Sequence, residues 1–245
     1  MKISEIKALT FDVGGTVLDW HRGLSQAFAD SGARRGANAD WAAIANEYRR
    51  RSLGAMVGQA APSFNIDDVH RDMLDTVIQE HDLSKFTQDD RDTIRRAWHA
   101  LDAWPDFPTA LARLRSKYVV AAFTILSTSL IVDVSRRNGL IWDCVVSCEM
   151  IGDYKPRLKA YRICAKWLGY RPDELLMVAC HNFDLMAARE AGFRSAFVQR
   201  PAEWGPAGPP DPTPNPAHDI VVSDFGELAR RLGAENGDGH AAQLS

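Results

Sequence analysis

From residue 119 onward, short apolar runs alternate with stretches of helical periodicity, and this alternation constrains the fold more than any other feature. The runs at 119–126, 142–148 and 175–179 are apolar enough for buried strands. Helical spacing follows them at 129–138, 157–168 and 184–191, and shorter strands at 195–198 and 220–222 precede a closing helix at 224–232. Because strands separated by helices pair in parallel, the pattern predicts an α/β fold: a doubly wound, Rossmann-like parallel sheet.

The N-terminal part of the chain predicts one more strand and then an insertion. Residues 6–11 form an apolar run, and helical spacing follows at 21–31, 39–57, 66–81 and 88–101. Four helices are too many for one crossover between parallel strands. We therefore expect a helical cap at 15–105, inserted into a catalytic core formed by 1–14 and 106–235, with a flexible tail at 236–245.

Bulk properties exclude several classes of partner. With a net charge of −3 over 245 residues, the chain lacks the excess of positive charge that is typical of proteins that bind nucleic acid or an anionic membrane. No apolar run reaches the roughly 18–20 residues that span a bilayer, and no secretory signal is visible, so a cytoplasmic location is expected. The four cysteines are expected to be reduced, and neither a metal nor a cofactor is expected. A homodimer is possible. Seven of the twelve prolines fall in 201–216, which predicts an extended surface loop.

The first strand ends at a carboxylate, Asp12, which is followed by Val13, Gly14, Gly15 and Thr16. In an open α/β sheet, ligands bind at the carboxyl ends of the strands. The two glycines allow the backbone to approach a ligand and to turn its N–H groups inward. A fixed carboxylate beside such an anion cradle suggests a nucleophile that forms an ester with its substrate.

The next three strands also end in polar residues. Ser127 and Thr128 place a hydroxyl and N–H groups at a helix N-terminus, which suits an anion. Lys155 follows the next strand and would keep Asp12 ionised. Asp184 follows the fourth strand. Taken singly, these residues have structural alternatives: a helix cap for Ser127 and Asp184, and a solvated charge for Lys155.

These four motifs, in this order and across nearly the whole chain, resemble the haloacid dehalogenase superfamily. Its magnesium-dependent phosphatases carry a second aspartate two residues after the nucleophile, where this chain has Gly14. They also commonly carry an acid four residues before the last aspartate, where this chain has Cys180, a soft ligand that magnesium does not favour.

The sequence looks more like the (S)-2-haloacid dehalogenases, hydrolases that need no metal. In that branch a cap arginine binds the leaving halide, which corresponds to Arg49, with Leu53 on the same helix face. Asp184 is expected to position water, and His181, which stands where the family has an asparagine, is expected to take part in this. The resemblance implies Asp12, Arg49, Lys155, His181 and Asp184 as catalytic residues. It implies Val13, Gly14, Thr16, Leu53, Ser127, Thr128, Tyr161 and Phe183 as substrate-binding residues, with Phe64 as a loosely aligned cap wall.

Besides His181, Gly14 and Thr128 depart from the family pattern. Gly14 replaces an aromatic residue, which should widen the pocket floor, and Thr128 replaces an asparagine. The implied reaction is hydrolytic dehalogenation of short 2-haloalkanoic acids to 2-hydroxy acids through an ester on Asp12, with release of a halide ion.

Three alternatives remain open. One is a magnesium-dependent phosphatase, and another is a catalytically silent binding domain of the same fold. The third, a phosphonate-cleaving relative, would need a cap lysine for a Schiff base, but no lysine occurs between Lys7 and Lys85.

Overall fold

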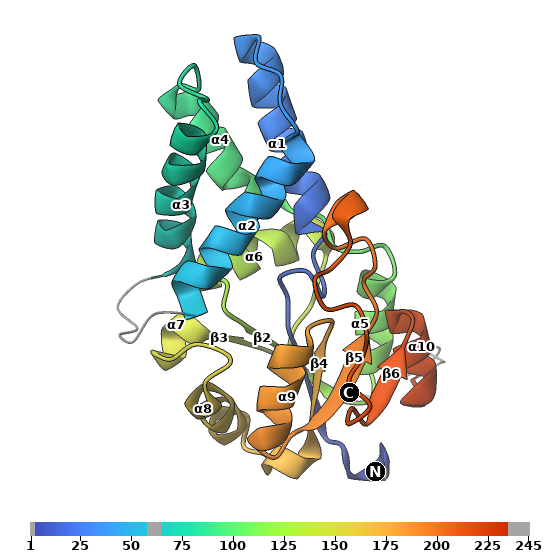
Figure 1. Ribbon diagram of the computed structural model, residues 1–245. Helices are drawn as coiled ribbons and strands as arrows, with labels where there is room; N and C mark the ends of the chain where they lie inside the picture. Colours follow the sequence, from blue (N-terminus) through green and yellow to red (C-terminus); the bar gives the residue numbers. More distant parts are fainter. Residues whose placement is uncertain (1–2, 58–64, 235–245) are drawn as a thin grey trace, which may run out of the picture.

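The computed structural model describes residues 3–57 and 65–234 and contains a six-stranded parallel sheet. Its strand order is β3-β2-β1-β4-β5-β6, which confirms the predicted α/β class. The strands are β1 (Ala8–Phe11), β2 (Val119–Thr124), β3 (Cys144–Ser147), β4 (Leu175–Ala179), β5 (Arg194–Val198) and β6 (Ile220–Val222). All six agree with the predicted strands to within a few residues at each end. Figure 1 shows the sheet edge-on below a group of helices.

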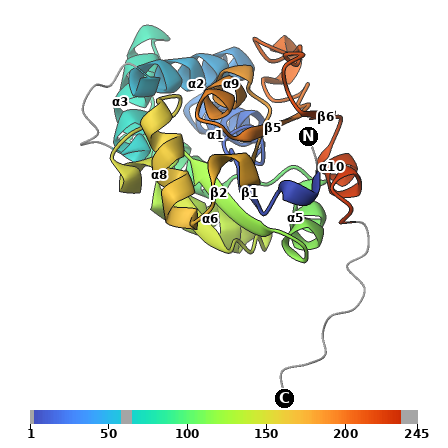
Figure 2. The same cartoon turned by 90° about the horizontal axis from the view of Figure 1, so that it is seen from below.

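Helices cover both faces of the sheet (Figure 2). One face carries α5 (Phe107–Arg115), α6 (Thr128–Asn138) and α10 (Phe225–Arg231), and the other carries α8 (Leu158–Leu168) and α9 (Asn182–Glu190). A short helix, α7 (Cys148–Ile151), follows β3. The sequence did not predict α5, although its buried face of Phe107, Leu111 and Leu114 has helical spacing.

The strand order reverses between β1 and β4, and this reversal fixes where a ligand can bind. The chain runs from β1 outward to β3, crosses back to β4 and then continues outward to β6. Because successive right-handed crossovers then leave the sheet on opposite faces, a crevice opens at the carboxyl ends of β1 and β4. Asp12 directly follows β1, and Cys180 directly follows β4.

Four helices stand above this edge of the sheet (Figure 1). They are α1 (Trp20–Arg35), α2 (Trp41–Val57), α3 (Ile66–Glu80) and α4 (Gln88–Ala97), close to the four predicted segments. Inside this group the buried Asp90 carboxylate accepts hydrogen bonds from Arg34 at 3.1 Å and from Arg35 at 2.6 Å. The boundaries 15–105 of the cap as a domain stay a prediction. Phe64 and the predicted tail at 236–245 lie outside the described residues.

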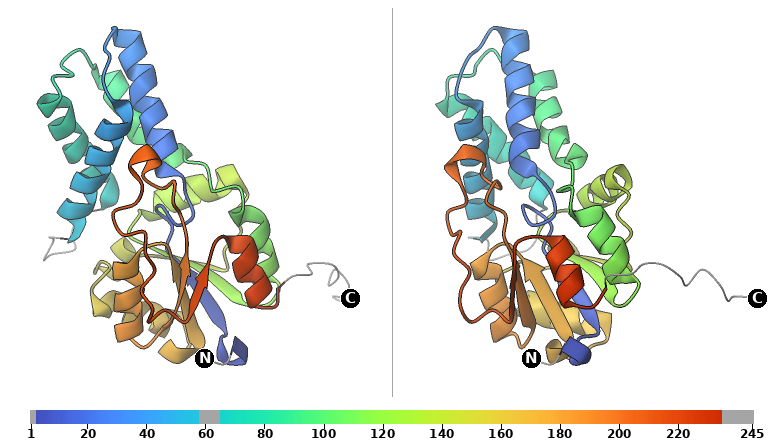
Figure 3. Two further views of the ribbon diagram at one scale, coloured as in Figure 1. Left: turned by 45° about the vertical axis from the view of Figure 1, so that its right-hand side comes forward. Right: turned by 90° about the vertical axis from the view of Figure 1, so that its right-hand side faces the viewer.

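The prediction of a surface loop at 201–216 was partly wrong. The segment carries a 3-10 turn (Gly205–Ala207), and Glu203 and Trp204 are buried, with exposed fractions of 1% and 6%. Figure 3 shows this segment rising beside α1. The indole of Trp204 packs edge-on against that of Trp20, with ring centroids 4.9 Å apart. Burial of this aromatic pair draws the loop away from solvent.

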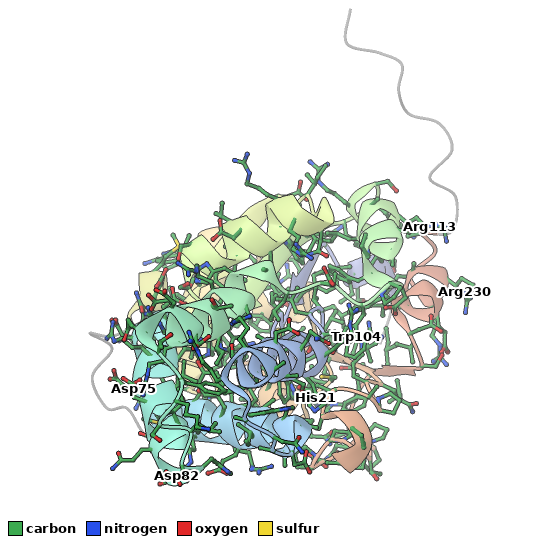
Figure 4. All side chains as sticks on the ribbon, turned by 90° about the horizontal axis from the view of Figure 1, so that it is seen from above. His21, Asp75, Asp82, Trp104, Arg113 and Arg230 are labelled. Atoms are coloured by element: carbon green, nitrogen blue, oxygen red, sulfur yellow. The ribbon has the colours of Figure 1, made fainter. Side chains whose placement is uncertain are left out.

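A second contact joins this loop to the first cap helix. A Cβ built on Gly205 would lie 2.2 Å from the ring of His21, the α1 residue labelled in Figure 4, so only a glycine fits there. Within residues 3–57 and 65–234, no helix is long and apolar enough to cross a bilayer.

Candidate active site

Asp12 lies at the centre of a buried hydrogen-bond network. Its Oδ1 accepts a hydrogen bond from Lys155 Nζ at 2.9 Å, and its Oδ2 accepts one from Thr16 Oγ1 at 2.7 Å. His181 Nδ1 lies 3.1 Å from the same Oδ2. Burial alone would raise the pKa of the Asp12 carboxyl, but the charges of Lys155 and His181 hold that pKa well below its usual range. Asp12 is therefore ionised.

Lys155 bridges two carboxylates. Its Nζ donates to Asp184 Oδ2 at 2.6 Å and to the carbonyl oxygen of Phe123 at 3.1 Å, in addition to Asp12. Burial would lower the pKa of this amine, but Asp12 and Asp184 together raise it, so the ammonium charge is retained. The hydroxyl of Tyr161 donates to Asp184 Oδ1. Oδ2 of Asp184 thus holds Lys155, while Tyr161 occupies Oδ1.

His181 is paired with a second carboxylate that the sequence did not reveal. Its Nε2 lies 3.0 Å from Glu203 Oε1, which also accepts a hydrogen bond from Trp20 Nε1 at 3.0 Å. Burial would lower the pKa of His181, but Cys180, Glu203 and Asp12 raise it well above its ordinary value. The imidazole therefore carries its proton at neutral pH while both carboxylates are ionised.

Gly15, the second of the two glycines after Asp12, leaves space for the pair of His181 and Glu203. A Cβ built on Gly15 would lie 2.0 Å from Glu203 Oε1, and the residue has a φ of +93°. Both the space and the left-handed backbone require glycine here. Gly15 thus leaves space for the side chain of Glu203, in addition to the close approach of the backbone to a ligand that the sequence predicts.

Arg49 enters the site from α2 and is buried, with 2% of its surface exposed. Its guanidinium lies over the rings of Trp20 and Trp98, 5.7 and 5.5 Å from their centroids. Its Nη2 donates a long hydrogen bond of 3.5 Å to the carbonyl oxygen of Gly14. Within the described part of the chain, its Nε and Nη1 find no hydrogen-bond partner. Burial lowers the pKa of Arg49, although not enough to remove the charge of an arginine.

A cavity of about 100 Å³ joins these groups. Its polar lining consists of Asp12, Lys155, His181, Asp184 and Arg49, and its remaining walls are Gly14, Leu53, Met56, Ile125, Phe183, Trp204 and Pro210. Gly14 was expected to widen the pocket floor. The space beside it is instead occupied by Arg49, whose Nη2 would lie 3.2 Å from a Cβ at that position. The cavity is a small, largely apolar space with charges on opposite sides.

Five predicted substrate-binding residues do not line this cavity. The side chain of Val13 is buried. The hydroxyl of Thr16 donates a hydrogen bond to Asp12, and that of Tyr161 donates one to Asp184. Ser127 is the N-cap of α6, and its Oγ donates to Asp67 Oδ2 of α3 at 2.7 Å.

Thr128 does not line the cavity either. Its backbone N–H donates to Glu149 Oε1 at 2.6 Å, while its buried hydroxyl has no partner among the described residues. The N–H and hydroxyl donors expected to hold a substrate carboxylate therefore hold two carboxylates of the protein, Glu149 and Asp67.

Comparison with known proteins agrees with this geometry. Residues 6–192 match the haloacid dehalogenase-like hydrolase family. The chain is 24% identical over 206 residues to (S)-2-haloacid dehalogenase 4A of Burkholderia cepacia, covering 81% of this chain and 85% of that protein. It is 27% identical over 203 residues to the (S)-2-haloacid dehalogenase of Xanthobacter autotrophicus, with 80% and 76% covered.

Solved structures extend the comparison. The fold superposes on a defluorinating L-2-haloacid dehalogenase with a TM-score of 0.86 and 35% identity, covering 93% of this chain and 95% of the other. A second L-2-haloacid dehalogenase has a TM-score of 0.86 and 33% identity, with 94% and 99% covered. The chain therefore belongs to the haloacid dehalogenase-like hydrolases, and within them to the L-2-haloacid dehalogenase branch.

Proposed function

We propose that this protein hydrolyses short (S)-2-haloalkanoic acids to 2-hydroxy acids through an ester on Asp12. One observation carries the proposal: an ionised, lysine-bound carboxylate and a buried arginine with unpartnered N–H groups line the same small cavity. The carboxylate is a nucleophile, and the arginine is a receptor for the anion that leaves. The names of the related proteins support this assignment.

In the first step, an oxygen of Asp12 attacks the carbon that bears the halogen, from the side opposite the halogen. The new C–O bond forms as the carbon–halogen bond breaks, and the bonding electron pair leaves with the halide. Arg49, which lines the cavity, stabilises the developing negative charge with its guanidinium N–H groups. Lys155 holds the nucleophile in place by its hydrogen bond to Oδ1.

The donors at the N-terminus of α6 suit the carboxylate of the substrate. Ser127 Oγ and the N–H of Thr128 already donate to carboxylate oxygens of Asp67 and Glu149, which supports a role in binding that group. We place the substrate carboxylate at these donors, where it would displace at least one protein carboxylate.

In the second step, water attacks Cγ of the Asp12 ester, and the ester C–O bond breaks to release the 2-hydroxy acid. Formation of the ester removes the negative charge of Asp12, one of the groups that raises the pKa of His181. The imidazole can then lose its proton to solvent, accept one from the attacking water at Nδ1, and return that proton to the alkoxide oxygen that leaves as the 2-hydroxy acid, while Glu203 orients the ring. We assign water activation to His181 with Glu203, and the positioning of Lys155 to Asp184.

Halide release from (S)-2-chloropropionate and fluoroacetate in the presence of EDTA tests this proposal. We expect steady halide release from at least one acid, and loss of more than about 1,000-fold in a folded Asp12→Asn variant, because an amide is a poor nucleophile. In a single turnover in ¹⁸O-labelled water, the first product should contain an unlabelled oxygen from Asp12. Label in every first-turnover product would contradict the ester.

The same assay with p-nitrophenyl phosphate and magnesium tests the phosphatase alternative. Phosphate release without halide release would mean that acidic residues elsewhere replace the two that phosphatases carry at the positions of Gly14 and Cys180. Tight binding of 2-haloacids without any turnover would instead identify a silent binding domain.

A further inference from the structure

Three different metal-binding side chains meet beside the active-site cavity. Cys180 Sγ lies 3.4 Å from His181 Nε2 and 3.6 Å from Glu203 Oε2, and His181 Nε2 lies 3.0 Å from Glu203 Oε1. One ligand atom from each residue lies within 4.8 Å of the other two. Cys180 and Glu203 are buried, so this is not a chance gathering of surface acids.

The separations of these side chains suit ligands of one zinc ion. Zinc bonds of about 2.3 Å to sulfur and about 2.0–2.2 Å to nitrogen and oxygen give ligand-to-ligand separations of roughly 3.3–3.6 Å in tetrahedral geometry. The 3.4 Å between Cys180 Sγ and His181 Nε2 falls in this range. Glu203 meets these two residues with different carboxylate oxygens, and one ligand atom of each residue lies within 4.8 Å of the other two. We propose that Cys180, His181 and Glu203 form a binding site for Zn²⁺ or a similarly thiophilic divalent ion.

The surroundings of His181 fit a metal ligand independently of the spacing. A metal-bound histidine usually donates its other ring N–H to a carboxylate, which fixes the tautomer and orients the ring. His181 Nδ1 lies 3.1 Å from Asp12 Oδ2, which leaves Nε2 directed at Cys180 and Glu203. Glu203 is itself held by Trp20 Nε1. The three ligands thus have their orientation fixed before any ion binds.

The donor set selects the ion. A thiolate is a soft ligand that zinc accepts and magnesium does not, so the site differs from the magnesium site of a phosphatase. Zinc binds a thiolate and a neutral imidazole, so binding at Cys180 and His181 releases protons and strengthens as the pH rises. His181 lines the first cavity, and Cys180 lines a second one of about 240 Å³.

Zinc at this site would act as an inhibitor. On the proposed function, His181 must accept a proton from water in the second step through Nδ1, the ring nitrogen that faces Asp12. A zinc ion on Nε2 keeps the proton of the neutral ring on Nδ1, which then has no free lone pair, while the first step, which uses Asp12 and Arg49, does not need that lone pair. A zinc-loaded enzyme should release about one halide per active site and then stop with the ester in place.

Competition with a chromophoric zinc chelator tests the site on the metal-free, full-length protein. We expect one equivalent of zinc to bind wild type, at least tenfold weaker binding by Cys180→Ser, and unchanged binding by Cys144→Ser, a cysteine outside the cluster. No zinc uptake by wild type, or equal uptake by Cys180→Ser, would overturn the proposal.

A cobalt titration of wild type gives a second measurement that needs no variant. Co²⁺ should produce a thiolate-to-cobalt charge-transfer band and tetrahedral visible bands, and octahedral spectra without the thiolate band would refute the site. Zinc uptake and the cobalt spectrum are both measured without dehalogenation. Each can therefore support or overturn the metal site whether or not the proposed function is correct. Full turnover by zinc-loaded enzyme would refute the inhibitory role alone.

Discussion

The two sides of the active-site cavity differ in how their buried charges are satisfied. On the core side, Asp12, Lys155 and Asp184 form a network in which every charged group has at least two hydrogen-bond partners. On the cap side, Arg49 is equally buried but leaves Nε and Nη1 without a partner in the described part of the chain. Indole rings flank it instead.

The charged groups on the core side thus have hydrogen-bond partners without a ligand, whereas Arg49 has N–H groups that find none among the described residues. A buried charge without hydrogen bonds costs free energy, so an unpartnered guanidinium is expected to persist only where function requires it. Arg49 also lines the cavity of about 100 Å³, so we infer that its guanidinium receives a small anion there. On the proposed function that anion is the halide. Three substitutions test the difference.

Removing the core cation should have the largest effect on stability. Lys155→Met leaves Asp12 and Asp184 buried without their shared counter-ion, so we expect the free energy of unfolding to fall by about 3–5 kcal/mol. Urea denaturation measures it, with the exposed Lys166→Met as the control, expected within about 0.5 kcal/mol of wild type. A Lys155→Met protein as stable as wild type would mean that the network is not held by its charges.

The corresponding substitution on the cap side should have the opposite sign. Arg49→Met removes a cation whose N–H groups are unsatisfied, so the free energy of unfolding should rise by about 1 kcal/mol. Halide release should nevertheless fall at least about 100-fold, since a donor to the leaving group is lost. The exposed neighbour Arg50→Met is the control for both measurements.

A chloride titration sharpens the same test. An anion bound by Arg49 should raise the melting temperature of wild type more than that of Arg49→Met, and general salt effects cancel in this difference. Equal shifts in the two proteins would argue against an anion site at Arg49.

The smallest effect is expected from the pH dependence of stability. The raised pKa of His181 contributes stability that is fully present below its unfolded value of about 6.5 and is lost as the pH rises through the folded pKa. The stability advantage of wild type over His181→Asn should therefore shrink above about pH 6.5, by roughly 1.4 kcal/mol for each unit of pKa shift. A difference that stays constant from pH 6 to 10 would contradict the ion pairs with Asp12 and Glu203.

The core side of the site could be anticipated from the sequence because it depends on topology alone. Asp12, Lys155 and Asp184 each follow a strand of a parallel sheet, and the carboxyl ends of such strands meet. The order of apolar runs was sufficient to bring them together, and the fold class followed from the same pattern.

Glu203 and the partners of Ser127 could not be anticipated, because tertiary packing places them. Glu203 lies in an irregular, proline-rich segment whose path depends on the contact between Trp204 and Trp20. The only signal was the Glu-Trp pair itself, a large aromatic residue within an otherwise polar loop. Asp67 reaches Ser127 from a cap helix, and periodicity does not predict how a cap sits on its core.

The indoles that flank Arg49 also give the protein an optical property. Trp20 and Trp98 both have their rings close to the guanidinium, so a halide bound to its free N–H groups would lie beside two natural fluorophores. Heavy halides quench an excited indole on contact. The arrangement that stabilises the leaving group would thus make bromide or iodide visible as a loss of intrinsic emission, in the unlabelled protein and during turnover.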